Sequence, residues 1–96
     1  MEIRVQSLKF NADQKLLDYV QKKVEKLERF DETVTSVEVA LSLMEKPENK
    51  SVHLQVHVPG ETLLIERNAK TFEEATNEAV DAMKEKMVRS KEKRYQ

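Results

Sequence analysis

Apolar and polar residues alternate along the middle of the chain, and this alternation constrains the fold more than any other feature. Segments 37–44 and 52–58 place a valine or leucine at every second position, a period that predicts β-strands with one buried face. Shorter runs of the same pattern occur at 2–8 and 61–69. Pro59-Gly60 predicts a tight turn, because proline presets φ and glycine tolerates the positive φ that follows. The sequence therefore predicts four strands, the last three joined by short links.

A segment with helical period separates the first strand from the second. Its apolar residues Leu16, Leu17, Val20, Val24 and Leu27 follow the three- and four-residue steps of a helix with one buried stripe. The pair at positions 11 and 14, asparagine and glutamine, has the spacing of a capping box and predicts the helix start. The helix is expected to end near residue 30.

A second helix is predicted after the last strand, from Phe72 to about residue 93. Thr71 and Glu74 form another capping box at its start. The apolar stripe of this helix stops at Met87, and the next residues on the same line are Ser90 and an arginine at position 94. We therefore expect the last turns to project beyond the sheet.

These elements predict an α+β fold in β-α-β-β-β-α order, a four-stranded mixed sheet with two helices packed on one face, in a single domain of residues 1–96. The strand–helix–strand unit is parallel and right-handed, and burying both helical stripes against one sheet face is the simplest packing. The predicted core residues are Val20, Val24, Leu27, Val39, Leu41, Leu54, Val56, Ile65, Val80 and Met83. The predicted solvated sheet face carries Arg4, Gln6, Glu38, Ser42, His53, Gln55 and His57.

The composition argues against several classes of site. The chain has no cysteine, so thiolate metal sites and cysteine nucleophiles are excluded, and one glycine is too few for a glycine-rich phosphate loop. The two histidines, His53 and His57, lie about 13 Å apart on one strand, too far to share a metal unaided. We expect no catalytic residues, no metal, no cofactor and no small-molecule substrate, and the protein is not predicted to be an enzyme.

No apolar run exceeds three residues, whereas a membrane-spanning helix needs about 20. The first four residues, Met-Glu-Ile-Arg, do not resemble an apolar signal sequence. We therefore expect a cytoplasmic protein that does not act at a membrane.

The net charge of −1 conceals an asymmetry along the chain. Residues 84–96 contain six basic and two acidic residues, a net charge of +4, so residues 1–83 carry −5. A basic end on an acidic body indicates one localised anionic partner rather than general affinity for nucleic acid.

Basic residues form the most informative pattern in the two predicted helices. On the first helix, lysines and one arginine recur on a line opposite the apolar stripe, with Lys23 on the flank; an ordinary solvated face laced with pairs such as Asp18–Lys22 would give a similar pattern. On the last helix, basic residues occupy both flanks, and the alternative there is a frayed soluble tail. The candidate RNA-binding residues are Lys22, Lys23, Lys26, Arg29, Lys84, Lys86, Arg89, Lys91, Lys93 and Arg94.

Dispersed aromatic residues offer no stacking platform for single strands, so recognition of folded RNA by shape and charge is favoured. With the segment 17–27 (LDYVQKKVEKL) and the terminal segment 83–93 (MKEKMVRSKEK), the chain resembles the short ribosome hibernation-promoting factors, also called ribosome-associated inhibitors or ribosomal subunit interface proteins. The resemblance extends over nearly the whole chain and includes the β-α-β-β-β-α order.

The resemblance implies binding to the small ribosomal subunit and its ribosomal RNA, in the channel that mRNA and tRNA use, with translation blocked by occupancy and without chemistry. Lys23 and Lys26 match basic positions of the family on the first helix. Arg89, Lys91 and Lys93 match those on the last. It also implies a protein that is monomeric off the ribosome.

The sequence departs from the family pattern around the last helix. Many relatives carry aspartate, tyrosine and aspartate near its start, where this chain has Thr71, Glu73 and Asn77. The outward line of that helix is acidic, with Glu74, Glu78, Asp81 and Glu85. We therefore expect RNA contacts on its flanks and end rather than along its middle.

Two other classes of function remain open from the sequence. A general double-stranded-RNA-binding module is one, although the acidic body argues against broad RNA affinity. A protein-interaction module using the solvated sheet face is the other, and it predicts that Arg4 and His53 matter while the lysines do not.

Overall fold

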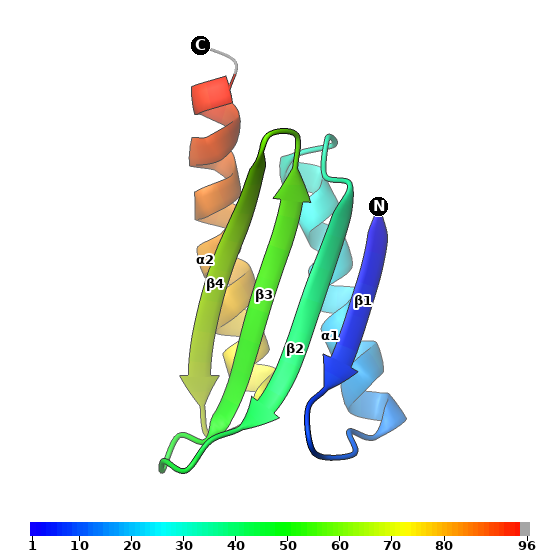
Figure 1. Cartoon of the computed structure of the whole chain (residues 1–96), viewed down its shortest axis with the longest axis vertical. Helices are drawn as coiled ribbons and strands as arrows, with labels where there is room; N and C mark the ends of the chain where they lie inside the picture. Colours follow the sequence, from blue (N-terminus) through cyan, green and yellow to red (C-terminus); the bar gives the residue numbers. More distant parts are fainter. Residues whose placement is uncertain (95–96) are drawn as a thin grey trace.

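The structure, a computed structural model, describes residues 1–94 and has the predicted element order (Figure 1). Tyr95 and Gln96, part of the predicted domain, lie outside the described residues. The elements are β1 (Glu2–Ser7), α1 (Gln14–Glu25), the 3₁₀ helix η1 (Lys26–Phe30), β2 (Ser36–Leu43), β3 (Lys50–Val58), β4 (Glu61–Ala69) and α2 (Phe72–Arg94). The sheet order is β1-β2-β3-β4, with β1 parallel to β2 and the other pairs antiparallel. The predicted α+β fold with a mixed four-stranded sheet is confirmed.

The strand register places the apolar residues of neighbouring strands opposite one another. Val37 lies between Ile3 of β1 and Val56 of β3, and Val56 in turn pairs with Leu63 of β4. Because side chains alternate between the two faces of a strand, this register gathers the β-branched and leucine side chains on one face of the sheet.

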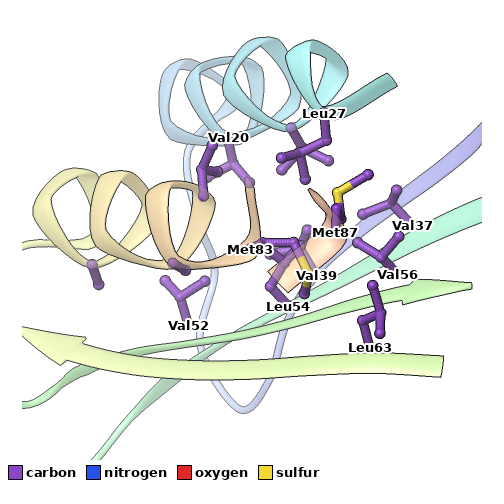
Figure 2. Packing of buried hydrophobic residues seen from close by; sticks show 14 of the residues in the cluster. Val20, Leu27, Val37, Val39, Val52, Leu54, Val56, Leu63, Met83 and Met87 are labelled. Carbon is purple, nitrogen blue, oxygen red and sulfur yellow. The ribbon is translucent and has the colours of Figure 1, made fainter. Parts of the chain in front are cut away.

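Both helices cover that apolar face (Figure 1). Figure 2 shows Val20 and Leu27 from the first helical segment close to Met83 and Met87 of α2, with Leu63 of β4 on the sheet side. Nine of the ten predicted core residues are buried. The tenth, the β4 isoleucine, is half-buried and packs against the same cluster.

The predicted start of the first helix is wrong by two residues. Asp13 is the N-cap, and its Oδ1 accepts from the Leu16 backbone N–H at 2.8 Å. Asn11 lies upstream of the cap, and the Gln14 amide donates instead to Asp18 at 2.8 Å. Aspartate and asparagine are about equally good caps, so the sequence did not separate the two positions. The second cap is confirmed: the Thr71 hydroxyl accepts from the α2 backbone at 3.1 Å.

The first helix also tightens at its end. The predicted single helix to residue 30 is α-helical to Glu25 and 3₁₀ from Lys26 to Phe30. Residues three apart eclipse one another in a 3₁₀ helix. Lys26 and Arg29 therefore lie one above the other on η1.

The last turns of α2 reach beyond the β3–β4 turn (Figure 1), as the end of the apolar stripe predicts. They are nevertheless held against the body of the protein. Ser90 is buried and donates to a Glu61 carboxylate oxygen at 2.7 Å, and Arg94 contacts Asp31. The buried line of α2 thus continues past Met87 with polar contacts in place of apolar ones.

Candidate nucleic-acid interface

Three candidate basic residues line a groove between β1 and the first helix. Lys22, Lys26 and Arg29 are exposed and share this groove, of about 710 Å³, with Met1 and Ile3. Two further groove residues, glutamates at positions 25 and 28, are exposed as well. The groove therefore carries a modest net positive charge, because its carboxylates partly offset the three basic groups.

Aromatic rings hold two lysines near the seam between the helices. The Lys23 ammonium lies 5.6 Å from the centre of the Tyr19 ring, and the Tyr19 hydroxyl donates to Asn77 Oδ1 on α2 at 3.0 Å. The Lys84 ammonium lies 5.6 Å from the centre of the Phe30 ring. Both contacts are within the range of cation–π attraction, so each of these ammonium groups lies against an aromatic ring.

Lys86 lies on the flank of α2 that faces β4 and contacts the edge of the sheet. Its Nζ donates to the backbone carbonyl oxygen of Leu64 on β4 at 2.9 Å. β4 is an edge strand with unpaired backbone groups, and a lysine on such an edge discourages pairing with another chain. Lys86 is therefore engaged by the sheet edge, unlike Arg89 on the same flank of α2.

The candidates at the end of α2 differ in how far they are engaged. Arg89 and Lys93 are exposed, and within residues 1–94 neither makes an ion pair. Lys91 Nζ lies 3.8 Å from Glu32 Oε2. The Arg94 guanidinium is bonded to Asp31 and is mostly covered. Arg89 and Lys93 are thus the two terminal residues most open to a partner.

The topology brings the last turns of the two helical segments to one end of the molecule. α1 and α2 run in the same direction, so the end of η1 and the end of α2 lie at the same end (Figure 1). Basic residues fill the last turn of both α-helices, where they also complement the negative end of each helix macrodipole. The dipole effect alone explains why basic residues occur in the last turn of each helix. It does not explain why the last turns of both helices lie at the same end of the molecule.

The outer line of α2 is acidic before its last turns, as predicted. Glu74, Glu78, Asp81 and Glu85 are all exposed, and within this line Asp81 lies 3.7 Å from Lys84 Nζ. Among the candidate residues, the exposed basic side chains therefore lie at the far end of α2 and in the groove of the first helix.

The opposite face of the sheet is open and polar. His53 Nε2 lies 3.6 Å from Glu66 Oε1, and His57 Nε2 lies 3.4 Å from Glu38 Oε2, so each histidine has its own carboxylate partner. A hollow of about 680 Å³ on this face is flanked by exposed Leu64 and by other polar and apolar side chains. Across residues 1–94, no group of three or more histidine or acidic side chains is placed to bind a metal ion.

Sequence reasoning missed Asp31, the one buried carboxylate within residues 1–94, and the aromatic supports of two lysines. The four-residue spacing of Tyr19 and Lys23 could have indicated their contact, because residues four apart are neighbours on a helix. Asp31 and Thr33 have the spacing of an aspartate turn, but the pairing of Asp31 with an arginine 63 residues away leaves no local signal.

Across the part of the chain that the structure describes, no helix is long and apolar enough to span a membrane.

Comparison with known proteins relates the whole chain to one family. The family model described as Sigma 54 modulation protein / S30EA ribosomal protein matches residues 3–95. The crystal structure of the N-terminal domain of Protein Y from Thermus thermophilus is similar, with a TM-score of 0.80 and 27% sequence identity over 93% of this chain and 98% of that one. A ribosomal subunit interface protein from Coxiella burnetii shares the fold, with a TM-score of 0.85 at 13% identity over 95% and 98%. No curated protein sequence gives a significant match.

Proposed function

Because the chain belongs to the Sigma 54 modulation protein / S30EA ribosomal protein family, as its helical segments predicted, we propose that it is a ribosome hibernation factor. It binds the small ribosomal subunit and its ribosomal RNA through the basic ends of its two helices. It occupies the channel that mRNA and tRNA use and silences translation by occupancy, without catalysis. In this proposal residues 1–96 act as one ribosome-binding domain, monomeric off the ribosome and cytoplasmic like its partner.

The observation that carries this proposal is that both helical segments, each with exposed basic residues in its last turns, end at the same end of the molecule (Figure 1). The first group is Lys22, Lys26 and Arg29 in the groove beside β1. The second is Arg89 and Lys93 at the end of α2. Phosphate neutralisation by lysine and arginine supplies most of the affinity of sequence-independent nucleic-acid binding, and two groups at one end of the molecule can contact separate phosphates of one folded RNA.

The acidic outer line of α2 supports a folded RNA target of defined shape over duplex RNA in general. A ligand that lay along the whole helical face would meet Glu74, Glu78 and Asp81, all exposed, and their carboxylates would repel its phosphates. A ligand that contacts only the basic end avoids that line. A general double-stranded-RNA-binding module is therefore the less favoured alternative.

Co-sedimentation with purified small ribosomal subunits over a salt series tests the proposal. About six phosphate contacts predict that the logarithm of the affinity falls against the logarithm of the salt concentration with a slope of about −4 to −5. Plain duplex RNA and large subunits serve as controls and should bind more weakly. Binding with a slope near zero would contradict phosphate neutralisation and favour a ribosomal protein as the partner.

A protein-interaction function through the open sheet face is the second candidate. The hollow on that face and its exposed Leu64 favour it, because an apolar side chain beside polar ones is common in protein interfaces. It predicts that substitutions at Arg4 or His53 impair function, whereas substitutions of the helical lysines do not.

A further inference from the structure

Asp31 is a buried carboxylate that has no part in the RNA-binding surface proposed above. It follows η1 directly and is 0% exposed. Its Oδ1 accepts from the Thr33 backbone N–H at 3.0 Å and from the Thr33 hydroxyl. Its Oδ2 accepts from Arg94 Nη2, while Arg94 Nη1 donates to the Thr33 hydroxyl oxygen at 3.1 Å. The three side chains therefore form a closed network between the loop after η1 and the end of α2.

We propose that Asp31, Thr33 and Arg94 form a clasp that positions the basic end of α2 beside η1, so that the two basic groups are presented to one RNA in a fixed arrangement. Arg94 is then a positioning residue and not an RNA contact. This inference rests on the proposed function and adds to it the means by which the two surfaces are aligned.

The contacts of the last turns of α2 support this role. The apolar stripe ends at Met87, and beyond it Ser90, Lys91 and Arg94 make polar contacts with other elements. The Lys91–Glu32 pair is 3.8 Å long, and the Glu32 side chain is 82% exposed, so it adds little, as exposed pairs generally do. The Ser90–Glu61 hydrogen bond ties α2 to β4 and not to η1. Between residues 88–94 and the loop after η1, the clasp is the contact that is built on a buried group, Asp31.

The ionisation of Asp31 is consistent with a permanent clasp at neutral pH. Burial raises the pKa of Asp31, but the hydrogen bonds from Thr33 and the bonded guanidinium of Arg94 more than offset burial, and the pKa lies below its ordinary value. The carboxylate is therefore charged at neutral pH, where an arginine partner is strongly favoured over any neutral one.

Direct contact of Arg94 with RNA is the competing account. The two accounts predict opposite changes in RNA affinity for the variant Asp31→Asn. Asp31→Asn removes a negative charge and releases the guanidinium. If Arg94 contacts phosphate, this variant should bind RNA as well as or better than the wild type. If the clasp positions the basic end, the same variant should bind less well despite its higher positive charge.

The experiment measures the affinity of the full chain for purified small subunits, its salt dependence, and amide hydrogen exchange of residues 88–94. The variants are Asp31→Asn, Arg94→Gln and the double variant. We expect each single variant to lose about fivefold to tenfold in affinity and the double variant to lose no more than either, the behaviour of residues in one network. Exchange of residues 88–94 should accelerate in all three, because that segment loses its anchor.

Three matched variants separate positioning from charge and from general destabilisation. Glu32→Gln makes the same charge change as Asp31→Asn in the same loop without touching the clasp, and should keep wild-type exchange and bind at least as tightly as the wild type. Arg94→Lys keeps the charge but not the planar fork, and should restore affinity only in part. Thr33→Val removes the bridging hydroxyl without any charge change, and tests the clasp even if Asp31→Asn fails to fold.

Each outcome decides a different claim. Wild-type or tighter binding by Asp31→Asn, or unchanged exchange of residues 88–94 in that variant, would overturn the positioning role while leaving the proposed function intact. Full rescue by Arg94→Lys would also overturn it, because charge alone would then suffice. Failure of the wild-type chain to bind small subunits would overturn the proposed function and the positioning role together.

Discussion

The two parts of α2 are held in place by different forces. Residues 72–87 lie against the sheet through a continuous apolar stripe that includes Phe72, Met83 and Met87, and their outer line is acidic. Residues 88–94 are held by the polar partners of Ser90 and Arg94, and their outer surface is basic. Apolar packing leaves the charge of the outer line free to vary, whereas the terminal part uses charged groups both for attachment and for the proposed binding. Substitutions should therefore act through folding in the first part and through binding in the second.

The largest expected effect belongs to the core under the first part. Val56→Asp should unfold the domain, because Val56 is 0% exposed and an unpaired buried carboxylate costs several kcal/mol, against a total stability of about 5–10 kcal/mol for a domain of this size. Circular dichroism and denaturant titration measure this. Leu64→Asp is the matched control, since Leu64 is 56% exposed on the open face. A folded, soluble Val56→Asp variant would contradict the assigned strand faces.

The next effect should distinguish the two basic groups. Changing Arg89, Lys91 and Lys93 to glutamine keeps helix propensity nearly constant, so the variant should fold. We expect it to lose about tenfold or more in affinity for small subunits and to show a salt slope shallower by about 2 to 3. The corresponding variant of Lys22, Lys23 and Lys26 should lose less, because glutamates 25 and 28 already weaken the field of the groove. Equal affinity of both variants and the wild type would show that these residues only keep the protein soluble.

A control for total charge is available at the other end of the molecule. Lys15, Lys46 and Lys70 are exposed, and they lie at the start of α1, in the β2–β3 loop and before α2, away from the basic end (Figure 1). Their change to glutamine removes the same three charges. If binding depends on the basic end, this variant should bind nearly as the wild type does. A loss as large as that of the terminal variant would indicate general electrostatic attraction instead of a local surface.

The clasp predicts a smaller effect on stability with a defined pH dependence. Because the folded pKa of Asp31 is lowered, its contribution to stability is present above the unfolded pKa of about 3.9 and is lost as the pH falls through the lower folded value. At neutral pH, Asp31→Asn should lower the free energy of unfolding by about 1–3 kcal/mol. Denaturant titrations at several pH values should show this difference shrinking below about pH 4. A difference that stays constant at acid pH would exclude the carboxylate as its source.

The sequence predicted the fold well because the strands and the core depend on local periodicity. The alternation of β2 and β3 identified the buried face, and Val39, Leu54 and Val56 lie in the core as expected. Errors occurred where neighbouring residues compete for one role, as Asn11 and Asp13 do at the start of α1. The 3₁₀ geometry of η1 was not predicted either. Short 3₁₀ turns are common at the ends of α-helices, and the predicted apolar stripe runs through both segments without a break.

The candidate site was predicted less completely, because its polar contacts join distant parts of the chain. Lys86 and Arg94 were grouped with the other basic residues by their position on α2. In the structure Lys86 bonds to a carbonyl of β4, 22 residues away, and Arg94 bonds to Asp31, 63 residues away. Periodicity places a side chain on a face of a helix, but it carries no information about a single partner elsewhere in the fold. Which basic side chains remain available to a partner is a property of tertiary structure.

The smallest effect is expected on the open face of the sheet, where substitutions should disturb neither part of α2. His53 and His57 face away from both helices, each 3.4–3.6 Å from a glutamate oxygen in a partly exposed pair. Exposed pairs contribute little, so changing both histidines to glutamine should alter stability by no more than about 0.5 kcal/mol. Affinity for small subunits and inhibition of translation should equal those of the wild type, because both side chains lie on the face of the sheet opposite the helices. If the histidine variant loses binding while both lysine variants bind normally, the functional surface is the open sheet face, and the assignment of the helical residues is wrong.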